Sequence, residues 1–159
     1  MARIWGPYGD DINTDLLFAG KYTYLGSNPE DIIPHLLEDL DPEFAGNAVN
    51  GDILVAGANF GCGSSRNQPA VGFKALDMTI IAISYSRIFF RASINLGLPL
   101  ISCPEAVAAY APGKSLQVDP ENAVVLVDGI KYAFKAFDPY VKGILAAGGL
   151  IPYVRAQID

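Results

Sequence analysis

The sequence predicts an α/β domain with a central, partly parallel sheet flanked by helices. Apolar runs at 53–57 and 78–84 have the composition of buried strands. Each is followed by a segment with helical character, at 68–76 and 86–96, and a third short strand is expected at 98–101. Strands that alternate with helices in this way form parallel βαβ units, so residues 53 to 101 are predicted to be one such unit.

A hairpin signal in the last third of the chain predicts antiparallel strands as well. Asp128-Gly129 lies between two apolar runs, and this dipeptide favours a tight two-residue turn. Around it we expect a helix at 105–111, strands at 116–119, 123–127 and 131–134, a helix at 139–147 ended by Gly148-Gly149, and a short tail strand at 151–154.

The first fifty residues are predicted to contain more loop than regular structure. A short strand is expected around Arg3–Trp5, followed by a segment rich in Gly, Asp and Asn. Asn28 and Pro29 form a helix-start signal, because Asn caps a helix and Pro suits its first turn. The apolar residues that follow have helical spacing as far as Leu40, so a helix is predicted from 29 to 40.

The composition excludes several classes of protein. The length of 159 residues fits one domain, and 51% hydrophobic with 18% charged residues is a globular balance. The net charge of −6 argues against a nucleic-acid-binding protein. The N-terminus has no signal-peptide pattern, and the apolar runs are too short to span a bilayer. We therefore expect a cytoplasmic protein without nucleic-acid or membrane partners.

Two cysteines, Cys62 and Cys103, are expected to be free thiols. They are too few and wrongly spaced to hold an iron–sulfur cluster or a zinc ion, so no cofactor is expected in this chain. The single histidine, His35, falls in the helix predicted at 29–40, which leaves a Ser-His-Asp triad without a third member.

The segment Gly57 to Gln68 is the strongest candidate for a functional site. It lies between a buried strand and a helix, where ligands bind in open α/β sheets. Glycines such as Gly63 let the backbone approach a ligand, and the following helix start offers N–H groups to an anion. Ser64, Ser65 and Arg66 add two hydroxyls and a guanidinium, which can grip a carboxylate at two points.

Two readings of this loop stay open on the residues alone. One is a site for an anion such as a carboxylate; the other is a tight turn in which a serine caps the helix and Arg66 faces water. A P-loop is excluded because no lysine follows the glycines, and a nucleophile elbow is excluded because Gly-x-Ser-x-Gly is absent.

The run from Asn59 to Arg66 resembles the signature of isopropylmalate dehydratase small subunits, shared in part with the swivel domain of aconitase. The resemblance continues over nearly the whole chain, in the same order. Besides the loop it includes Gly9 to Asp15, Asp41 to Phe44, Ser86 to Pro99 and Ala146 to Leu150. It implies a single swivel-like α/β domain over residues 1–159.

The resemblance also implies a division of labour between two chains. A separate large subunit would hold a 4Fe–4S cluster, and this chain would close over a small di- or tricarboxylate substrate. Ser64 would then be the base that takes a proton from carbon, Ser65 would help to hold it, and Arg66 would bind a substrate carboxylate. Asp15 would lie at the same site and orient a neighbouring cation or hydroxyl.

The resemblance places the substrate's variable group against the loop Lys21 to Ser27. In this family an arginine there accompanies an extra carboxylate, and an apolar residue accompanies an alkyl group. The present loop has Tyr24 and Leu25 and no arginine, which favours an alkyl group. Packing of these two residues on their own domain is the alternative, and Lys21 is a second cation that could reach a carboxylate.

The chain departs from the family pattern directly after Arg66, where Asn67-Gln68 replaces the usual Glu-His. The activity that the resemblance favours most is the isomerisation of 2- and 3-isopropylmalate by dehydration and rehydration, in leucine biosynthesis. The alternatives are the small subunit of a homoaconitase or of a dimethylmalate-type dehydratase, or a non-catalytic module that binds a small carboxylate.

Overall fold

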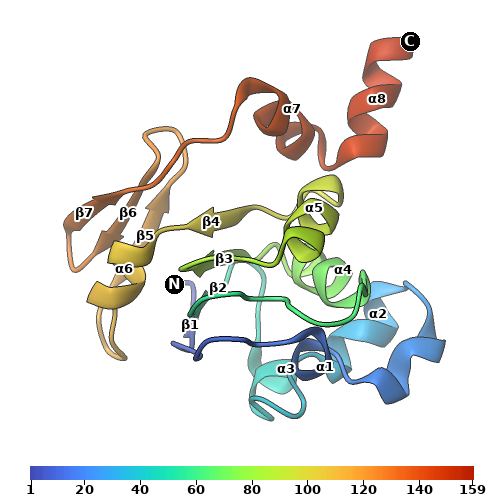
Figure 1. The fold of residues 1–159 in the computed structure, drawn as a ribbon, viewed down its shortest axis with the longest axis horizontal. Helices are drawn as coiled ribbons and strands as arrows, with labels where there is room; N and C mark the ends of the chain where they lie inside the picture. The colour runs from blue at the N-terminus through green and yellow to red at the C-terminus, as the bar shows by residue number, and fades with distance from the viewer.

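The computed structural model describes residues 1–159 and contains two sheets with helices gathered along the larger one (Figure 1). The larger sheet is parallel and has the order β1-β2-β3-β4. Its strands are β1 (Ile4–Trp5), β2 (Ile53–Ala56), β3 (Thr79–Ala82) and β4 (Leu100–Ser102). The predicted α/β class and the parallel unit over residues 53 to 101 are confirmed.

Strand β2 separates the two hydrophobic cores of the molecule. All four of its residues are buried, and successive side chains enter different cores. Leu54 and Ala56 join the larger core, which contains Phe44 and Phe73, whereas Val55 joins the smaller one. A strand buried on both faces is an unbroken apolar run, which is why this segment was recognisable from composition.

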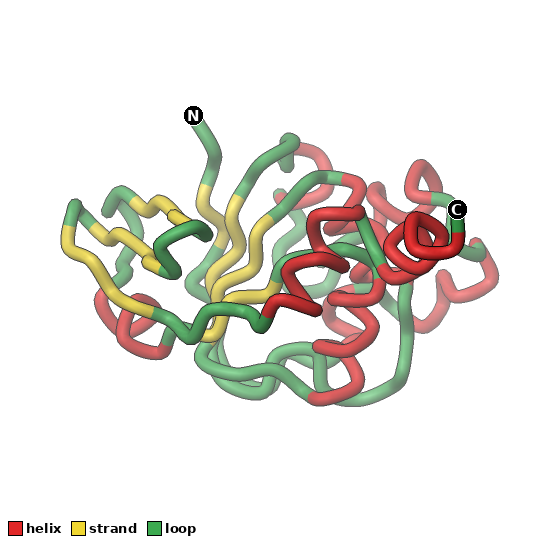
Figure 2. The backbone as a smooth tube through the Cα atoms, turned by 90° about the horizontal axis from the view of Figure 1, so that it is seen from above, coloured by secondary structure: helices red, strands yellow, loops and turns green.

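The predicted antiparallel strands form a sheet of their own. Strands β5 (Leu116–Asp119), β6 (Val124–Val127) and β7 (Ile130–Ala133) pair in that order, and the turn at Asp128-Gly129 has positive φ at both residues. Figure 2 shows this small sheet beside the parallel one. Alternate residues of β6, together with helix α6 (Pro104–Ala109), complete the smaller core.

Helices α4 (Gln68–Ala75) and α5 (Arg87–Asn95) connect successive parallel strands and pack on the larger core. Ser86 is the N-cap of helix α5, and its Oγ accepts a hydrogen bond from the Phe89 amide at 3.3 Å. Ile88 is apolar like the residues that follow it, but it is 56% exposed. It lies about 100° around the helix from Phe89, which is the residue that enters the core.

The helix predicted to reach Leu40 is wrong beyond its first turns. Helix α2 (Pro29–Ile32) continues only as the short 3-10 helix η2 (Ile33–His35), and Leu37 has a φ of 57°. Pro34 has no N–H to donate to the previous turn, so the α-helical ladder stops there. Leu36 and Leu37 are nevertheless fully buried. The apolar spacing therefore indicated correctly that these residues are buried, but not that they lie in a helix.

The predicted tail strand at 151–154 is also wrong, because these residues belong to helix α8 (Leu150–Ile158). It follows helix α7 (Pro139–Ala147), which ends at the left-handed Gly148 as predicted. The tail lies at the end of the chain without a neighbouring strand, and a helix satisfies its backbone internally (Figure 1). None of the helices has the length and hydropathy needed to span a membrane.

Candidate active site

The loop that follows β2 is held in place by the N-terminal segment that runs beside it. The Gly61 amide donates to the Ile12 carbonyl at 2.8 Å, and the Thr14 amide donates to the Cys62 carbonyl at 2.8 Å. The Thr14 hydroxyl then donates to the Ser64 carbonyl, again at 2.8 Å. Because these groups are 48 to 50 residues apart in sequence, only the folded chain builds this frame.

Gly61 is required by this packing. Its φ is 78°, and a Cβ at this position would lie 2.2 Å from a ring carbon of Phe89, far inside van der Waals contact. The loop therefore sits directly on the buried start of helix α5. This contact fixes where the exposed residues that follow, Gly63 to Ser65, emerge at the surface.

Ser64 and Ser65 are exposed, and neither hydroxyl has a hydrogen-bond partner within the protein. The Ser64 backbone is nevertheless engaged on its carbonyl by Thr14 and by the Arg66 amide, the latter at 2.9 Å. The backbone is thus held while the side-chain oxygens are free. The turn reading, in which a serine side chain caps helix α4, is not what the structure shows, because the N-cap residue is Asn67 and no side chain caps this helix.

Arg66 does not face water freely, since its side chain is only 18% exposed. Its NH1 group donates to Asp15 Oδ1 at 2.5 Å and to the Phe18 carbonyl at 3.1 Å. Asp15 lies in helix α1 (Thr14–Leu17), whose N-cap Asn13 accepts a hydrogen bond from the Leu16 amide. The predicted association of Asp15 with a cation of this loop is therefore present as an ion pair.

The remaining donors of Arg66 are unused. Neither Nε nor NH2 has an acceptor in the protein, and the single buried side-chain atom without a partner is Ser93 Oγ, so both nitrogens reach solvent. Gly20 lies beside NH2, because a Cβ there would be 3.1 Å from that nitrogen. A guanidinium fixed through one nitrogen and open along the other edge is suited to a two-point grip on a carboxylate.

The neighbouring 3-10 helix η1 (Gly20–Leu25) contains the residues predicted to meet the substrate's variable group. Tyr24 is 79% exposed, whereas Leu25 is half-buried and packs against the larger core. For Leu25 the alternative of packing on its own domain is thus what the structure shows. Tyr24 is the open side chain of the pair.

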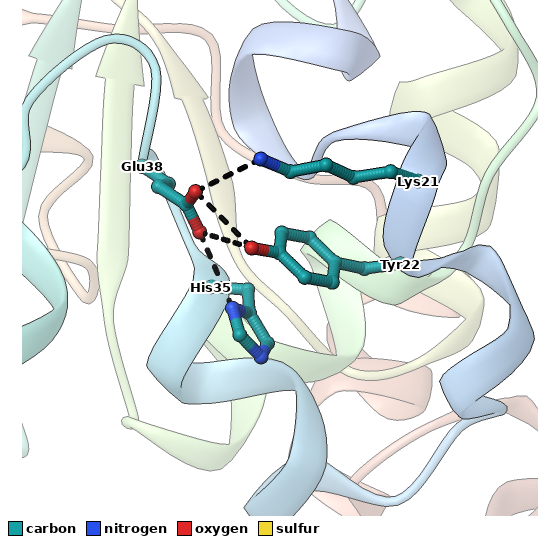
Figure 3. Close-up of polar contacts among 4 residues, drawn as sticks. All are labelled: Lys21, Tyr22, His35 and Glu38. Carbon is teal, nitrogen blue, oxygen red and sulfur yellow. Dashed lines mark hydrogen bonds and ion pairs between the residues drawn. The ribbon is translucent and has the colours of Figure 1, made fainter.

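Lys21 is already paired at the start of this loop. Its ammonium lies 3.1 Å from Glu38. The Tyr22 hydroxyl donates to the same carboxylate, 2.8 Å from one oxygen and 3.1 Å from the other, and His35 lies 3.3 Å from it (Figure 3). The Tyr22 and His35 rings stack with centroids 3.8 Å apart. Hydrogen bonds from Tyr22 and Lys21 hold the pKa of the Glu38 carboxyl below its usual value, and the same contact raises the pKa of Lys21.

Three features of this site were not predicted from the sequence: Thr14, the Phe18 carbonyl and Gly20. Thr14 stands next to Asp15 in the segment already singled out, so its position was a usable signal. The Phe18 carbonyl and the closeness of Gly20 to Arg66 have no signal in sequence, because both depend on how helix α1 packs beside the loop.

The chain offers no set of residues for a metal centre. No group of three or more His, Cys, Asp or Glu side chains is arranged to hold a metal ion. The two cysteines are apart: Cys62 is half-buried in the loop, and Cys103 is buried in the smaller core. An iron–sulfur cluster does not fit the donors of this chain.

The chain is similar to known proteins of one family. The model of the aconitase C-terminal domain matches residues 16–105, which include Ser64 to Arg66. A 3-isopropylmalate dehydratase small subunit from Caldicellulosiruptor bescii is 42% identical, with 95% of this chain and 92% of the relative covered. A 2,3-dimethylmalate dehydratase small subunit from Eubacterium barkeri is 39% identical, with 94% and 93% covered.

A solved structure agrees with these relatives. The crystal structure of a 3-isopropylmalate dehydratase from Methanocaldococcus jannaschii has a TM-score of 0.90 and 31% identity, and it covers 99% of this chain and 93% of that one. The fold, the matched domain and the sequence identity therefore agree over nearly the full length. The chain belongs to the family of dehydratase small subunits that carry the aconitase C-terminal domain.

Proposed function

We propose that this chain is the small subunit of a 3-isopropylmalate dehydratase, the hydro-lyase of leucine biosynthesis that interconverts 2- and 3-isopropylmalate. One observation carries the proposal: the exposed Ser64 and Ser65, whose hydroxyls have no partner in the protein, directly precede Arg66, whose Nε and NH2 have no acceptor there. Support comes from relatives of this name that are about 40% identical over most of the chain.

The residues of the loop have distinct roles in this proposal. Ser64, with its hydroxyl deprotonated, takes a proton from the carbon next to the one that bears the substrate hydroxyl. The electron pair left behind forms the double bond as the C–O bond breaks, and the departing hydroxyl takes up a proton and leaves as water. Ser65 holds the reacting groups by hydrogen bonding. Arg66 binds a substrate carboxylate through Nε and NH2, and Asp15 orients Arg66 from the opposite side. Gly63 lets the backbone approach the substrate.

The 4Fe–4S cluster implied by the family belongs to a large subunit in this proposal. When bound there, it would supply Lewis-acid polarisation of the substrate hydroxyl and so lower the demand on a weak base such as serine. This chain would supply the base, the carboxylate grip and the exclusion of water. As one swivel-type domain over residues 1–159, it would close over the cluster-bearing subunit in the cytoplasm.

Reconstitution tests the proposal directly. The purified chain, alone and mixed with a cluster-loaded large subunit, is assayed with 2-isopropylmalate. We expect no activity and no bound iron in the chain alone, and turnover in the mixture. Stoichiometric iron in the isolated chain, or an inactive mixture whose two subunits co-purify, would contradict it.

A second candidate substrate is 2,3-dimethylmalate, because the relative from Eubacterium barkeri is 39% identical, almost as similar as the isopropylmalate relatives. Both are alkyl-substituted malates. Homoaconitate is less favoured, since its extra carboxylate would need a cation and the Lys21 ammonium in η1 is paired with Glu38. A panel of the three substrates on the reconstituted complex separates these options.

A further inference from the structure

Gln68 makes a connection that the proposed chemistry does not use. It is the first residue of helix α4 and is half-buried. Its side-chain amide donates two hydrogen bonds, to the Thr23 carbonyl at 3.0 Å and to the Gly26 carbonyl at 3.1 Å. These are contacts across 45 and 42 residues of sequence, so they join two separate segments of the site.

The two carbonyls flank Tyr24 and Leu25, the pair predicted to meet the substrate's variable group. The Gly26 carbonyl accepts no hydrogen bond from the backbone, so its partner in the protein is the Gln68 amide. Loss of that amide would leave the carbonyl to water and release this end of the loop.

The opposite end of the same loop is held by a different cluster. Glu38 binds both Lys21 and Tyr22, and His35 stacks on the Tyr22 ring (Figure 3). The loop is therefore fastened at both ends, with the exposed Tyr24 between the two attachments. Only the Gln68 attachment leads back to the catalytic loop, since Gln68 lies two positions after Arg66.

We infer that Gln68 is a positioning residue that holds Tyr24 at a set distance from Ser64 and Arg66, and thereby determines which alkyl group the site accepts. The inference rests on the proposed function of the loop. A primary amide suits the task because a single nitrogen carries two N–H donors, one for each carbonyl. A glutamate would offer no donor and would place a charge against two carbonyl oxygens.

The test compares Gln68→Glu and Gln68→Ala with the wild type in the reconstituted complex. The matched control is Asn67→Ala, because Asn67 is the exposed neighbour and its side chain makes no hydrogen bond. The substrates are 2-isopropylmalate and 2,3-dimethylmalate. Loss of the two hydrogen bonds that hold the loop should raise KM for the bulkier isopropylmalate about 10-fold or more.

A positioning role predicts a split that general damage does not. We expect kcat within about 3-fold of wild type and a changed ratio of kcat/KM between the two substrates in both Gln68 variants, with Asn67→Ala unchanged. Equal loss on both substrates, or an unchanged ratio, would overturn the inference.

Amide hydrogen exchange on the chain gives a second readout that does not need activity. Residues 21 to 27 should exchange faster in Gln68→Glu than in wild type or Asn67→Ala, while strands β2 and β3 should not change. If the wild-type complex turns over neither substrate, the proposed function fails. The exchange rates then still show whether Gln68 holds residues 21 to 27 in place. Unchanged exchange at residues 21 to 27 would overturn the inference.

Discussion

At the amino end of β2 a polar side chain is fully enclosed by the protein, whereas at the carboxyl end polar side chains are left open. Asp52, just before β2, is fully buried and accepts hydrogen bonds from the Arg3 amide at 2.8 Å, the Trp5 indole at 2.9 Å and the Val49 amide at 3.0 Å. Ser64 and Ser65, on the loop after β2, have hydroxyls without any partner.

This difference separates residues that hold the fold from residues that are available to a ligand. A buried carboxylate that accepts three hydrogen bonds has no capacity left for a ligand, and removing it leaves three N–H donors without an acceptor. An exposed hydroxyl on a backbone that is itself held by Thr14 costs little to remove and is free to react. Stability should therefore depend on the amino end of β2, and turnover on the carboxyl end.

The largest expected effect is on turnover by Ser64→Ala. Loss of a general base should lower kcat about 10²–10⁴-fold in the reconstituted complex. The unfolding midpoint should not change, because the side chain makes no contact that holds the fold. Steady-state kinetics and urea denaturation of the same preparation measure both quantities. Turnover near the wild-type rate would place the base elsewhere.

Asp52→Ala should have the converse effect. The buried Trp5 indole N–H and the partly buried amides of Arg3 and Val49 would lose their acceptor. This loss should lower the free energy of unfolding by about 3 kcal/mol, as measured by urea denaturation. The exposed and unbonded Asp39 is the matched control, and Asp39→Ala should change stability by no more than about 0.5 kcal/mol. Loss of turnover in Asp52→Ala that remains folded would break the separation between the two ends.

Arg66 both contacts the protein through Asp15 and offers free donors to a ligand, so Arg66→Lys tests a residue with both roles. Lysine can keep a charge near Asp15 but has no planar edge for a carboxylate. We expect KM for isopropylmalate to rise about 10–100-fold, the loss of a charge-assisted contact, with a small change in stability. An unchanged KM would show that the open edge does not meet the substrate.

Substrate preference should respond to Tyr24 more than to Leu25. Tyr24→Arg places a guanidinium at the exposed tip of η1, whereas Leu25→Arg must first remove a side chain that packs on the core. We expect Tyr24→Arg to shift kcat/KM toward homoaconitate, with the gain set by a new charge-assisted hydrogen bond of about 1.5–3 kcal/mol at most. A larger shift from Leu25→Arg would mean that Leu25 turns outward in the complex.

The smallest expected effect is the response of η1 to acid. The pKa of Glu38 is lowered, chiefly by hydrogen bonds from Tyr22 and Lys21, so the contribution of Glu38 is present above its usual pKa of 4.5 and is lost as pH falls through the lower folded value. Tyr22 ring signals in NMR should therefore shift in acid below about pH 4.5. Glu38→Gln should abolish that transition.

Local signals in the sequence determined much of this protein. The buried runs of β2 and β3, the hairpin at Asp128-Gly129 and the left-handed end of α7 at Gly148 were all predicted correctly. Each depends on neighbouring residues: an apolar run, a turn dipeptide or a helix-ending glycine. The loop from Ser64 to Arg66 was recognisable for the same reason, since its residues are contiguous.

Other features of the fold depend on residues that are distant in sequence, and these were visible only in the tertiary structure. Whether residues 150 to 158 form a strand or a helix depends on whether a sheet edge is beside them, and none is. Leu37 is buried outside any helix because Pro34 interrupts the ladder while the core still takes the side chain.

The same holds within the site. Apart from the resemblance, nothing in the sequence indicates that Asp15 pairs with Arg66, 51 residues away, or that Gln68 reaches Thr23 and Gly26. Such contacts form only after packing has closed the long loops between them, and the entropy of that closure is offset by the whole core rather than by the contact itself.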